Sequence, residues 1–356
     1  MAQRGGAPPA LPLGQGCAEM MHSKKIIRHR YGAPRRVIRM GAPADFTAED
    51  LRAMQGLAQQ VTALRPDLLG GDATFGELAW CWGAGLTAAG QTWRRRLVYR
   101  GGEVAGWGWA YLPRRVVQTD GSVRESWKSS LTCQYHPDQP EVLDEVLAWF
   151  EDVTPDDLDR YVTPSSVDTE TIGRLAAGGY VIDEEANADD GDWHQYNRRA
   201  LGEIERPEIP DGFRFTSAAQ AGPAAAVQAH VSAWHPSSFS ARAYQDVLET
   251  ASYRGDLHVL LEAPDGTMAS TALMWFDEVN RTAEFEPVGT HPDYRRRGLG
   301  RALLLHGMRV ARDAGATQVA VACVGAPAHP AARNLYYSVG FELLNRDLAH
   351  VKRAVR

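Results

Sequence analysis

The sequence predicts an α/β (α+β) protein made of two copies of one domain. Its 356 residues are long for one domain and comfortable for two. One order of elements occurs twice: strand, helices, hairpin, a strand that ends in His-Pro-Asp, and a helix. The two tripeptides begin at His136 and His291, about 155 residues apart. This spacing indicates an internal duplication.

The pattern divides the chain into four segments. We expect a flexible tail at residues 1–35, a first domain at 36–200, a linker at 201–210 and a second domain at 211–356. The tail is rich in proline, glycine and basic residues, and has little apolar surface to offset its ordering entropy. Prolines mark the linker.

The first domain shows regular patterns from residue 36 onward. We expect a strand at 37–40, a helix through 51–61, a hairpin at 97–111, a strand at 130–135 and a helix at 141–150. Thr47 and Asp50 have the spacing of a helix-capping pair.

The second domain repeats this order. We expect a strand at 213–215, helices at 224–234 and 241–252 around a loop at 235–238, a hairpin of 257–262 with 269–276, and strands at 282–290 and 318–323. Pro287 lacks the N–H that a sheet ladder needs, so it is expected where pairing is broken or at a bulge.

Residues 284–302 (EFEPVGTHPDYRRRGLGRA) join a strand to a helix through a glycine-containing loop. Alternation places Glu284, Glu286, Val288 and Thr290 on one face of the strand. The first N–H groups of the helix have no internal acceptor, and the helix dipole adds positive charge there. Glycines in the loop allow a ligand to approach the backbone, and arginines add charge. The stretch therefore predicts a pyrophosphate site.

At this loop the chain resembles the GNAT superfamily of CoA-dependent N-acyltransferases, because Arg295, Gly298 and Gly300 fill the Arg/Gln-x-x-Gly-x-Gly/Ala signature. A second block, residues 329–341, resembles the family's N-x-x-A-x-x-L-Y-x-x-x-G-F helix. His329 stands there in place of the usual Asn. The resemblance covers residues 211–356 directly.

The resemblance implies a mixed, mostly antiparallel sheet flanked by helices in each copy. It implies that the central strands 282–290 and 318–323 splay apart, and that the pantetheine arm of acetyl-CoA lies between them. The implied CoA-binding residues are Val288, Thr290, Arg295, Arg296, Arg297, Gly298, Leu299, Gly300 and Arg301.

Acyl transfer from a thioester to an amine also needs a base for the acceptor and a partner for the departing thiolate. Tyr336 matches the family's tyrosine and is the candidate acid; Tyr337 points about 100° away on a helix. Glu286 is the candidate base and Glu284 its rival. The alternative is that both carboxylates bind a cationic acceptor.

The acceptor pocket is the least readable part of the site. His230 and Trp234, on the first helix of the second copy, are candidate acceptor residues together with Glu284. The alternative for Trp234 is a core residue, which is the more common role for a tryptophan at such a position. His230 is interpreted as a polar residue that recognises the acceptor or as an alternative base.

The first copy departs from the family pattern. It has Gln139-Pro140-Glu141-Val142-Leu143-Asp144 in place of the phosphate loop, and its acidic residues would repel a pyrophosphate. Residues 175–180 are the expected equivalent of 335–341, but they retain little of the sequence pattern and contain no match to Tyr336. We expect this copy not to bind CoA productively.

Composition sets the remaining expectations. A net charge of −6 disfavours a nucleic-acid partner, and no apolar run reaches the length of a membrane span. No pattern indicates a metal. We expect a cytoplasmic monomer or homodimer that transfers an acetyl group from acetyl-CoA directly to the primary amine of a small molecule. The alternatives are another acyl-CoA, an alcohol acceptor, decarboxylation of an acyl-CoA, or a CoA-binding sensor without turnover.

Overall fold

The computed structural model of the protein describes residues 46–69 and 71–354. The tail predicted at 1–35 and the strand predicted at 37–40 lie outside the described residues. Within the described ranges, no helix is both long and apolar enough to cross a membrane.

The first half of the chain contains most of the predicted elements and several others. They are α2 (Ala48–Leu64), α3 (Phe75–Ala89), β1 (Trp93–Arg100), β2 (Glu103–Tyr111), β3 (Arg114–Val117), β4 (Val123–Ser126), β5 (Ser129–Tyr135), α4 (Val142–Val153), β6 (Arg160–Val162), α5 (Thr169–Ala177) and β7 (Val181–Ile182). Thr47 and Asp50 form a capping box at the start of α2, as predicted. The hairpin of β1 and β2 is also confirmed.

The second half repeats the order. It contains β8 (His194–Ala200), β9 (Arg214–Ser217), α6 (Ala218–Ala221), α7 (Pro223–Ala233), α8 (Ala241–Leu248), β10 (His258–Glu262), β11 (Met268–Asp277), β12 (Thr282–Thr290), α9 (Leu299–Asp313), β13 (Gln318–Val324), α10 (Pro330–Ser338), β14 (Glu342–Arg346) and β15 (His350–Lys352). Residues 201–210 form neither helix nor strand.

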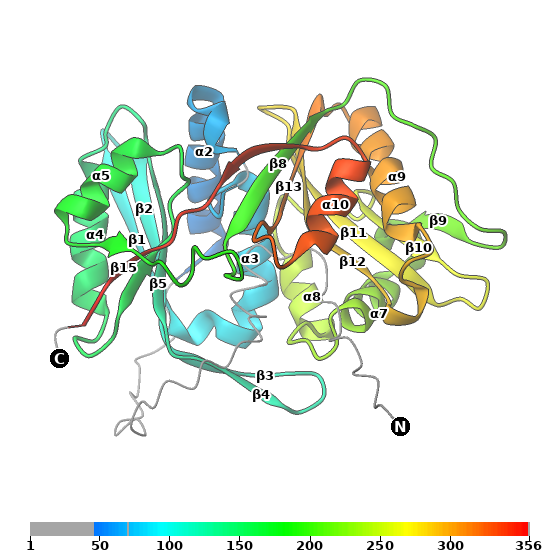
Figure 1. The fold of residues 1–356 in the computed structure, drawn as a ribbon, viewed down its shortest axis with the longest axis horizontal. Helices are drawn as coiled ribbons and strands as arrows, with labels where there is room; N and C mark the ends of the chain where they lie inside the picture. Colours follow the sequence, from blue (N-terminus) through cyan, green and yellow to red (C-terminus); the bar gives the residue numbers. More distant parts are fainter. Residues whose placement is uncertain (1–45, 70, 355–356) are drawn as a thin grey trace, which may run out of the picture.

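Two mixed sheets form the body of the molecule, and they exchange strands (Figure 1). The first sheet has the order β1-β2-β5-β6-β15-β7, and the second has the order β14-β8-β13-β12-β11-β10-β9. In Figure 1 the red C-terminal strand β15 crosses to the first sheet, where it pairs with β6 and β7. The green strand β8 lies in the second sheet, between β13 and β14. The first sheet therefore contains a strand that follows the predicted linker, β15, and the second sheet contains a strand that precedes it, β8.

The central strands of the second sheet diverge, as the resemblance implies. β12 and β13 pair in parallel only from Thr282 with Gln318 to Phe285 with Val321. Beyond that point β12 continues with Glu286 and Pro287, and its register with β11 shifts in the same place. Pro287 thus lies at a bulge where pairing ends, which confirms the prediction for it.

The bulge corrects the predicted alternation along β12. Phe285 and Val288 both belong to the core cluster that packs against α9, whereas Gly289 faces Trp234 of the opposite side. Glu284 contacts the start of α3. The prediction that Glu284, Glu286, Val288 and Thr290 share one face is wrong, because Glu284 and Val288 lie on opposite sides of the strand and an inserted residue reverses a period of two.

Helix α3 of the first half packs into the second half. Trp80 belongs to a buried cluster with Phe239, Tyr244 and Trp275. A Cβ atom at Gly83 would lie 2.8 Å from the Cα of Val247 in α8, so glycine allows the two helices to approach closely. A shared apolar core therefore joins the two halves.

Candidate functional site

The loop before α9 leads into a helix N-terminus that no side chain of the described residues caps. Its turn begins at His291, whose imidazole accepts the N–H of Asp293 at 3.2 Å. Arg296 and Gly298 have positive φ of 63° and 77°, and Gly298 is the N-cap of α9. The first helical bond runs from the Ala302 N–H to the Gly298 carbonyl, so the N–H groups of residues 299–301 precede it.

Gly300 lies where α9 meets α10. A Cβ atom there would be 3.3 Å from Leu335 Cδ2 and 3.5 Å from Thr290 Oγ1. Glycine therefore keeps open the space between the end of β12, the loop and α10. An anion at the helix N-terminus needs such an approach to the backbone.

The four arginines of the loop differ in what they contact. The half-buried Arg295 donates to the carbonyls of Thr290 and Ala233, both at 3.0 Å, and burial lowers its pKa. Arg297 lies over the Tyr294 ring, and Arg301 pairs with Glu205 at 2.6 Å. Arg296 is exposed. The side chain of Arg295 thus ties the loop to α7, while the charge of Arg296 remains at the surface.

Tyr336 and Tyr337 point in different directions from α10, as their helical spacing predicts. Tyr336 is fully buried in the cluster that contains Phe285, Val288 and Leu299. Tyr337 is 42% exposed, and its hydroxyl accepts a hydrogen bond from Gln195 at 2.9 Å. Tyr336 is therefore the tyrosine that packs against the diverging end of β12.

Glu284 is a cap for α3 of the first half. Its carboxylate accepts the Thr74 hydroxyl at 2.6 Å and the backbone N–H groups of Gly76 and Glu77. Burial raises its pKa to about 7, against the effect of these hydrogen bonds. A carboxylate at a helix N-terminus is stabilised by the dipole. Glu284 is thus placed at the contact between the halves.

Glu286 is buried next to the bulge. It is 2% exposed, and its carbonyl accepts the indole N–H of Trp275 at 2.9 Å. This contact holds the backbone of β12 at the point where β13 diverges. Of the two carboxylates, Glu286 is the one at the diverging end of the strand.

His230 and Trp234 lie in an aromatic cluster on the α7 side of β12. Their rings stack with centroids 4.4 Å apart, and His230 lies 4.3 Å from the Phe239 ring. Trp80 of α3 lies 5.6 Å from His230. A Cβ at Gly289 would be 2.3 Å from Trp234 Cη2. Both predicted residues are therefore close to β12, and both are buried in packing.

Sequence reasoning missed the contribution of α3. Trp80 and the N-terminus of α3 come from the first copy and reach His230 and Glu284 of the second. Thr74 and Glu77 have the spacing of an N-terminal capping motif, and Thr74 does accept the Glu77 N–H. This capping motif predicts where the helix begins, but it does not predict that Glu284 binds there. No group of three or more potential metal ligands occurs among the described residues.

The Acetyltransferase (GNAT) family profile matches residues 224–341. The second copy is a GNAT domain. The matched range includes β12, the loop, α9 and α10. The resemblance drawn from Arg295, Gly298 and Gly300 is thus confirmed.

Known proteins similar to this chain extend the comparison. Mycothiol acetyltransferase of Saccharomonospora viridis is 28% identical over 159 residues, which are 41% of this chain and 51% of that protein. The chain thus spans about half the length of this curated relative.

Two solved structures share the fold over 87% of this chain. One is a tandem GNAT protein from the clavulanic acid biosynthesis pathway, with a TM-score of 0.58, 16% identity, and coverage of 87% of this chain and 98% of that one. The other is a GCN5-related N-acetyltransferase from Sphaerobacter thermophilus, with a TM-score of 0.51, 17% identity, and coverage of 87% and 95%. The predicted tandem architecture is confirmed.

Proposed function

We propose that the protein is an acetyl-CoA-dependent N-acetyltransferase that acts on the primary amine of a small molecule. The observation that carries this proposal is the open N-terminus of α9 beside the diverging ends of β12 and β13. The N–H groups of residues 299–301 suit the pyrophosphate of CoA. The backbone of β12 beyond Phe285 has no ladder partner in β13, so it suits the amides of a pantetheine arm.

In this proposal Arg296 and the loop backbone hold the anionic end of the donor. Arg295 acts differently from the expectation for a charged loop, because its guanidinium binds the carbonyls of Thr290 and Ala233. We assign it to positioning the loop against α7. Val288 and Thr290 lie at the end of β12, where their backbone meets the acyl arm.

Direct transfer needs the amine nitrogen to attack the thioester carbon, so that a C–N bond forms and the C–S bond breaks. We assign Glu286 to receive the amine proton, directly or through water, and Tyr336 to donate a proton or hydrogen bond to the thiolate. Holding both reactants in line supplies much of the rate. Mycothiol acetyltransferase, the curated relative, is an acetyltransferase by name, which supports the donor class.

The test is acetyl-CoA-dependent release of free thiol across a panel of amines, which includes aminoglycosides, polyamines, amino acids and aminoacyl peptides. We expect release with one class of amine. With that amine, Glu286→Gln lowers kcat about a hundredfold at neutral pH and recovers part of it at high pH. Tight CoA binding without release from any amine would contradict an N-acetyltransferase and favour a sensor or a different acyl donor.

A further inference from the structure

The hairpin of β3 and β4 presents two different faces. β3 and β4 pair from Arg114 with Ser126 to Val117 with Val123. On β3, Arg114 and Val116 are buried, whereas Arg115 and Val117 are exposed. Arg124 pairs with Val116 across the hairpin, so it lies on the buried face with Arg114.

The arginines of the two faces differ in their partners. Arg115, on the exposed face, forms an ion pair with Glu125 at 2.8 Å. Arg114 is only 8% exposed, and among the described residues it has no hydrogen bond or ion pair. Its guanidinium lies over the Tyr111 ring, 5.7 Å from the centroid. The half-buried Arg124 likewise has no anionic partner within the described part of the chain.

Arg114 and Arg124 lie in an environment that disfavours their positive charges. Burial lowers the pKa of Arg114, and burial together with Arg114 lowers the pKa of Arg124. Burial raises the pKa of Tyr111, and Asp72 and Glu77 add to this effect, but neither carboxylate pairs with Arg114. A buried cation is normally paired with an anion. Two such cations on the same face of the hairpin suit an anion that contacts both.

The hairpin also contacts the acceptor side of the second copy. At its tip the Thr119 N–H donates to the Ser237 carbonyl at 2.7 Å, and the Ser237 N–H donates to Thr119 Oγ1 at 3.3 Å. Ser237 belongs to the α7–α8 loop, which follows Trp234. β3 packs against α3, which carries Trp80. Figure 1 shows the hairpin running from the first sheet below α3 toward α8.

We propose that Arg114 and Arg124 bind a carboxylate or phosphate group of the acceptor, which is then an amine that carries an anionic group. This inference rests on the proposed function and names the substrate class of that same site. The overall charge of −6 does not itself favour an anionic acceptor, so in this proposal the local basic pair supplies the preference. The first copy then contributes to specificity although it lacks the phosphate loop.

Kinetics with matched acceptors test the inference. Amino acids are compared with their amides, and phosphoethanolamine with ethanolamine, so that each pair differs by one anionic group. We expect Arg114→Gln and Arg124→Gln each to raise the KM of the anionic member at least about tenfold. The KM of acetyl-CoA and of the uncharged member stay unchanged. Arg115→Gln, on the exposed face, is the matched control and behaves as wild type. Equal effects on both members of each pair would overturn the inference.

A second readout does not depend on turnover. With saturating CoA and constant ionic strength, inorganic phosphate and acetate are titrated against the Tm of each variant. We expect at least one of the two anions to raise the Tm of the wild type and Arg115→Gln, and to have no effect on Arg124→Gln. The anion that acts distinguishes phosphate from carboxylate recognition. An equal response in all variants, or none in the wild type, would overturn the inference even if no amine is acetylated.

Discussion

The two copies of the domain share the turn that follows the central strand. His136 donates its N–H to the Ala105 carbonyl at 2.8 Å, and His291 donates to Ala269 at 2.9 Å. In both turns the imidazole accepts the N–H of the aspartate two residues later, at 3.3 and 3.2 Å. The same residues make the same contacts in both places, which is what a duplication predicts.

The copies differ directly after that turn. In the first copy the N–H groups of Val142, Leu143 and Asp144 donate to the carbonyls of residues 139–141, at 3.1 to 3.2 Å. The longer loop of the second copy leaves the equivalent groups before α9 without such bonds. Leu143 is buried at the helix position where the second copy has Gly300. The two helices thus differ by a few residues at their N-termini. In α4 the first N–H groups bond to the preceding backbone, whereas in α9 they are placed to suit an anion.

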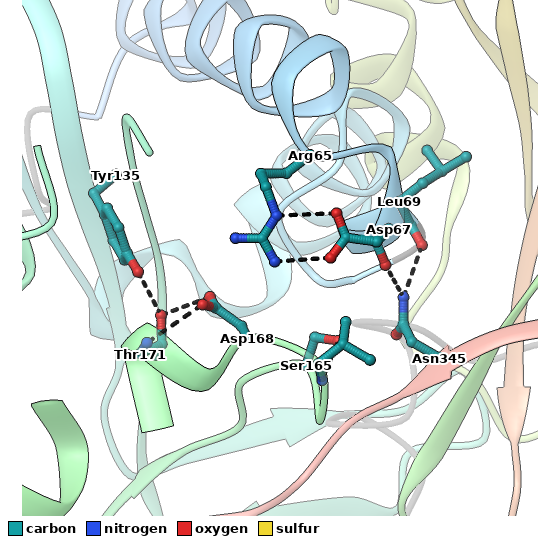
Figure 2. Close-up of polar contacts among 9 residues, drawn as sticks. Arg65, Asp67, Leu69, Tyr135, Ser165, Asp168, Thr171 and Asn345 are labelled. Carbon is teal, nitrogen blue, oxygen red and sulfur yellow. Dashed lines mark hydrogen bonds and ion pairs between the residues drawn. The ribbon is translucent and has the colours of Figure 1, made fainter. Parts of the chain in front are cut away.

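The gap between the central strands differs as well. In the first copy the three residues of β6 pair with β5 only from Ser129 to Leu131, so the end of β5 beyond Leu131 has no ladder partner in β6. Figure 2 shows what lies at that gap: the Tyr135 hydroxyl bonds to Thr171 Oγ1 at 2.9 Å, and Thr171 donates to Asp168 at 2.6 Å. The chain's own side chains therefore connect β5 to α5 across the gap.

Tyr336 has a leucine as its counterpart. Phe341 donates its N–H to the Tyr336 carbonyl, and Tyr180 donates in the same way to Leu175. Leu175 is fully buried and carries no hydroxyl. Next to the gap, Val61, Arg65, Leu68 and Gln134 help to line a cavity of about 30 Å³, which has room for water and not for a pantetheine arm. Both copies therefore share the fold, whereas, among the described residues, the unbonded N–H groups before the helix and the buried Tyr336 occur in the second copy.

The largest expected effect concerns the tyrosine that only the second copy has. Tyr336→Phe removes the hydroxyl from the diverging end of β12 and should lower kcat about a hundredfold with little change in the KM of acetyl-CoA. Steady-state thiol release measures both constants. Tyr337→Phe, at the exposed neighbour, is the control. Equal losses in the two variants would argue against a role for Tyr336 as the acid.

The next-largest effect is expected when Gly300 is replaced by leucine, the residue that the first copy has at the equivalent position, Leu143. Gly300→Leu places a side chain against Leu335 and Thr290, which are within 3.5 Å of a Cβ there. We expect CoA affinity to fall by about tenfold to a hundredfold, because the leucine side chain would fill the space through which an anion approaches the helix N-terminus. Calorimetric titration of CoA measures it. Gly173 of α5 has nothing within 4 Å, so Gly173→Ala should bind CoA as the wild type does.

A smaller effect tests the contact between the copies through pH. The pKa of Glu284 is about 7 in the folded protein and near 4.5 without the fold. Between these values the folded state holds a proton that the unfolded chain has lost, so the stabilising contribution of Glu284 falls as the pH rises. Gln does not titrate. Relative to Glu284→Gln, the wild type should lose about 1.4 kcal/mol of unfolding free energy per pH unit in this window.

Urea unfolding of both proteins from pH 5 to pH 8 makes that comparison. The exposed Glu208 provides the control, since Glu208→Gln should follow the wild type at every pH. A constant difference between the wild type and Glu284→Gln would mean that the Glu284 carboxyl does not titrate in this window in the folded protein.

The smallest effect opens the gap of the first copy. Thr171→Val removes the hydroxyl that joins Tyr135 to Asp168 and should cost about 1 kcal/mol of stability. CoA binding should not change, because the N–H groups of residues 142–144 still have acceptors. Appearance of a second CoA site in this variant would show that the hydrogen bonds across the gap, rather than the loop, exclude the ligand.

The sequence predicted the elements whose signals are local. The strand, loop and helix of residues 284–302, the capping pair Thr47 and Asp50 and the hairpin at 97–111 follow from periodicity, glycine and short-range hydrogen bonds. Pro287 was also informative, since a missing N–H has one physical meaning in a sheet. The side chains that cross between the copies have no such signal.

Long-range partners explain what the sequence could not predict. Glu284 looks like a member of the acceptor site until the N-terminus of α3 is seen to bind its carboxylate. The exchange of β8 and β15 depends on pairing between residues far apart in the chain, from Ala200 with Gln318 to Arg160 with Lys352. Alternation along β12 failed at Val288 because a bulge changes the face without changing the residue types.

The measurement that tests the account most directly is the stoichiometry of CoA binding by calorimetric titration of the full chain. The account predicts one CoA per chain, and loss of that site in Gly300→Leu. Two equivalent sites per chain, or a single site that Gly300→Leu leaves intact, would contradict the assignment of the ligand to the second copy.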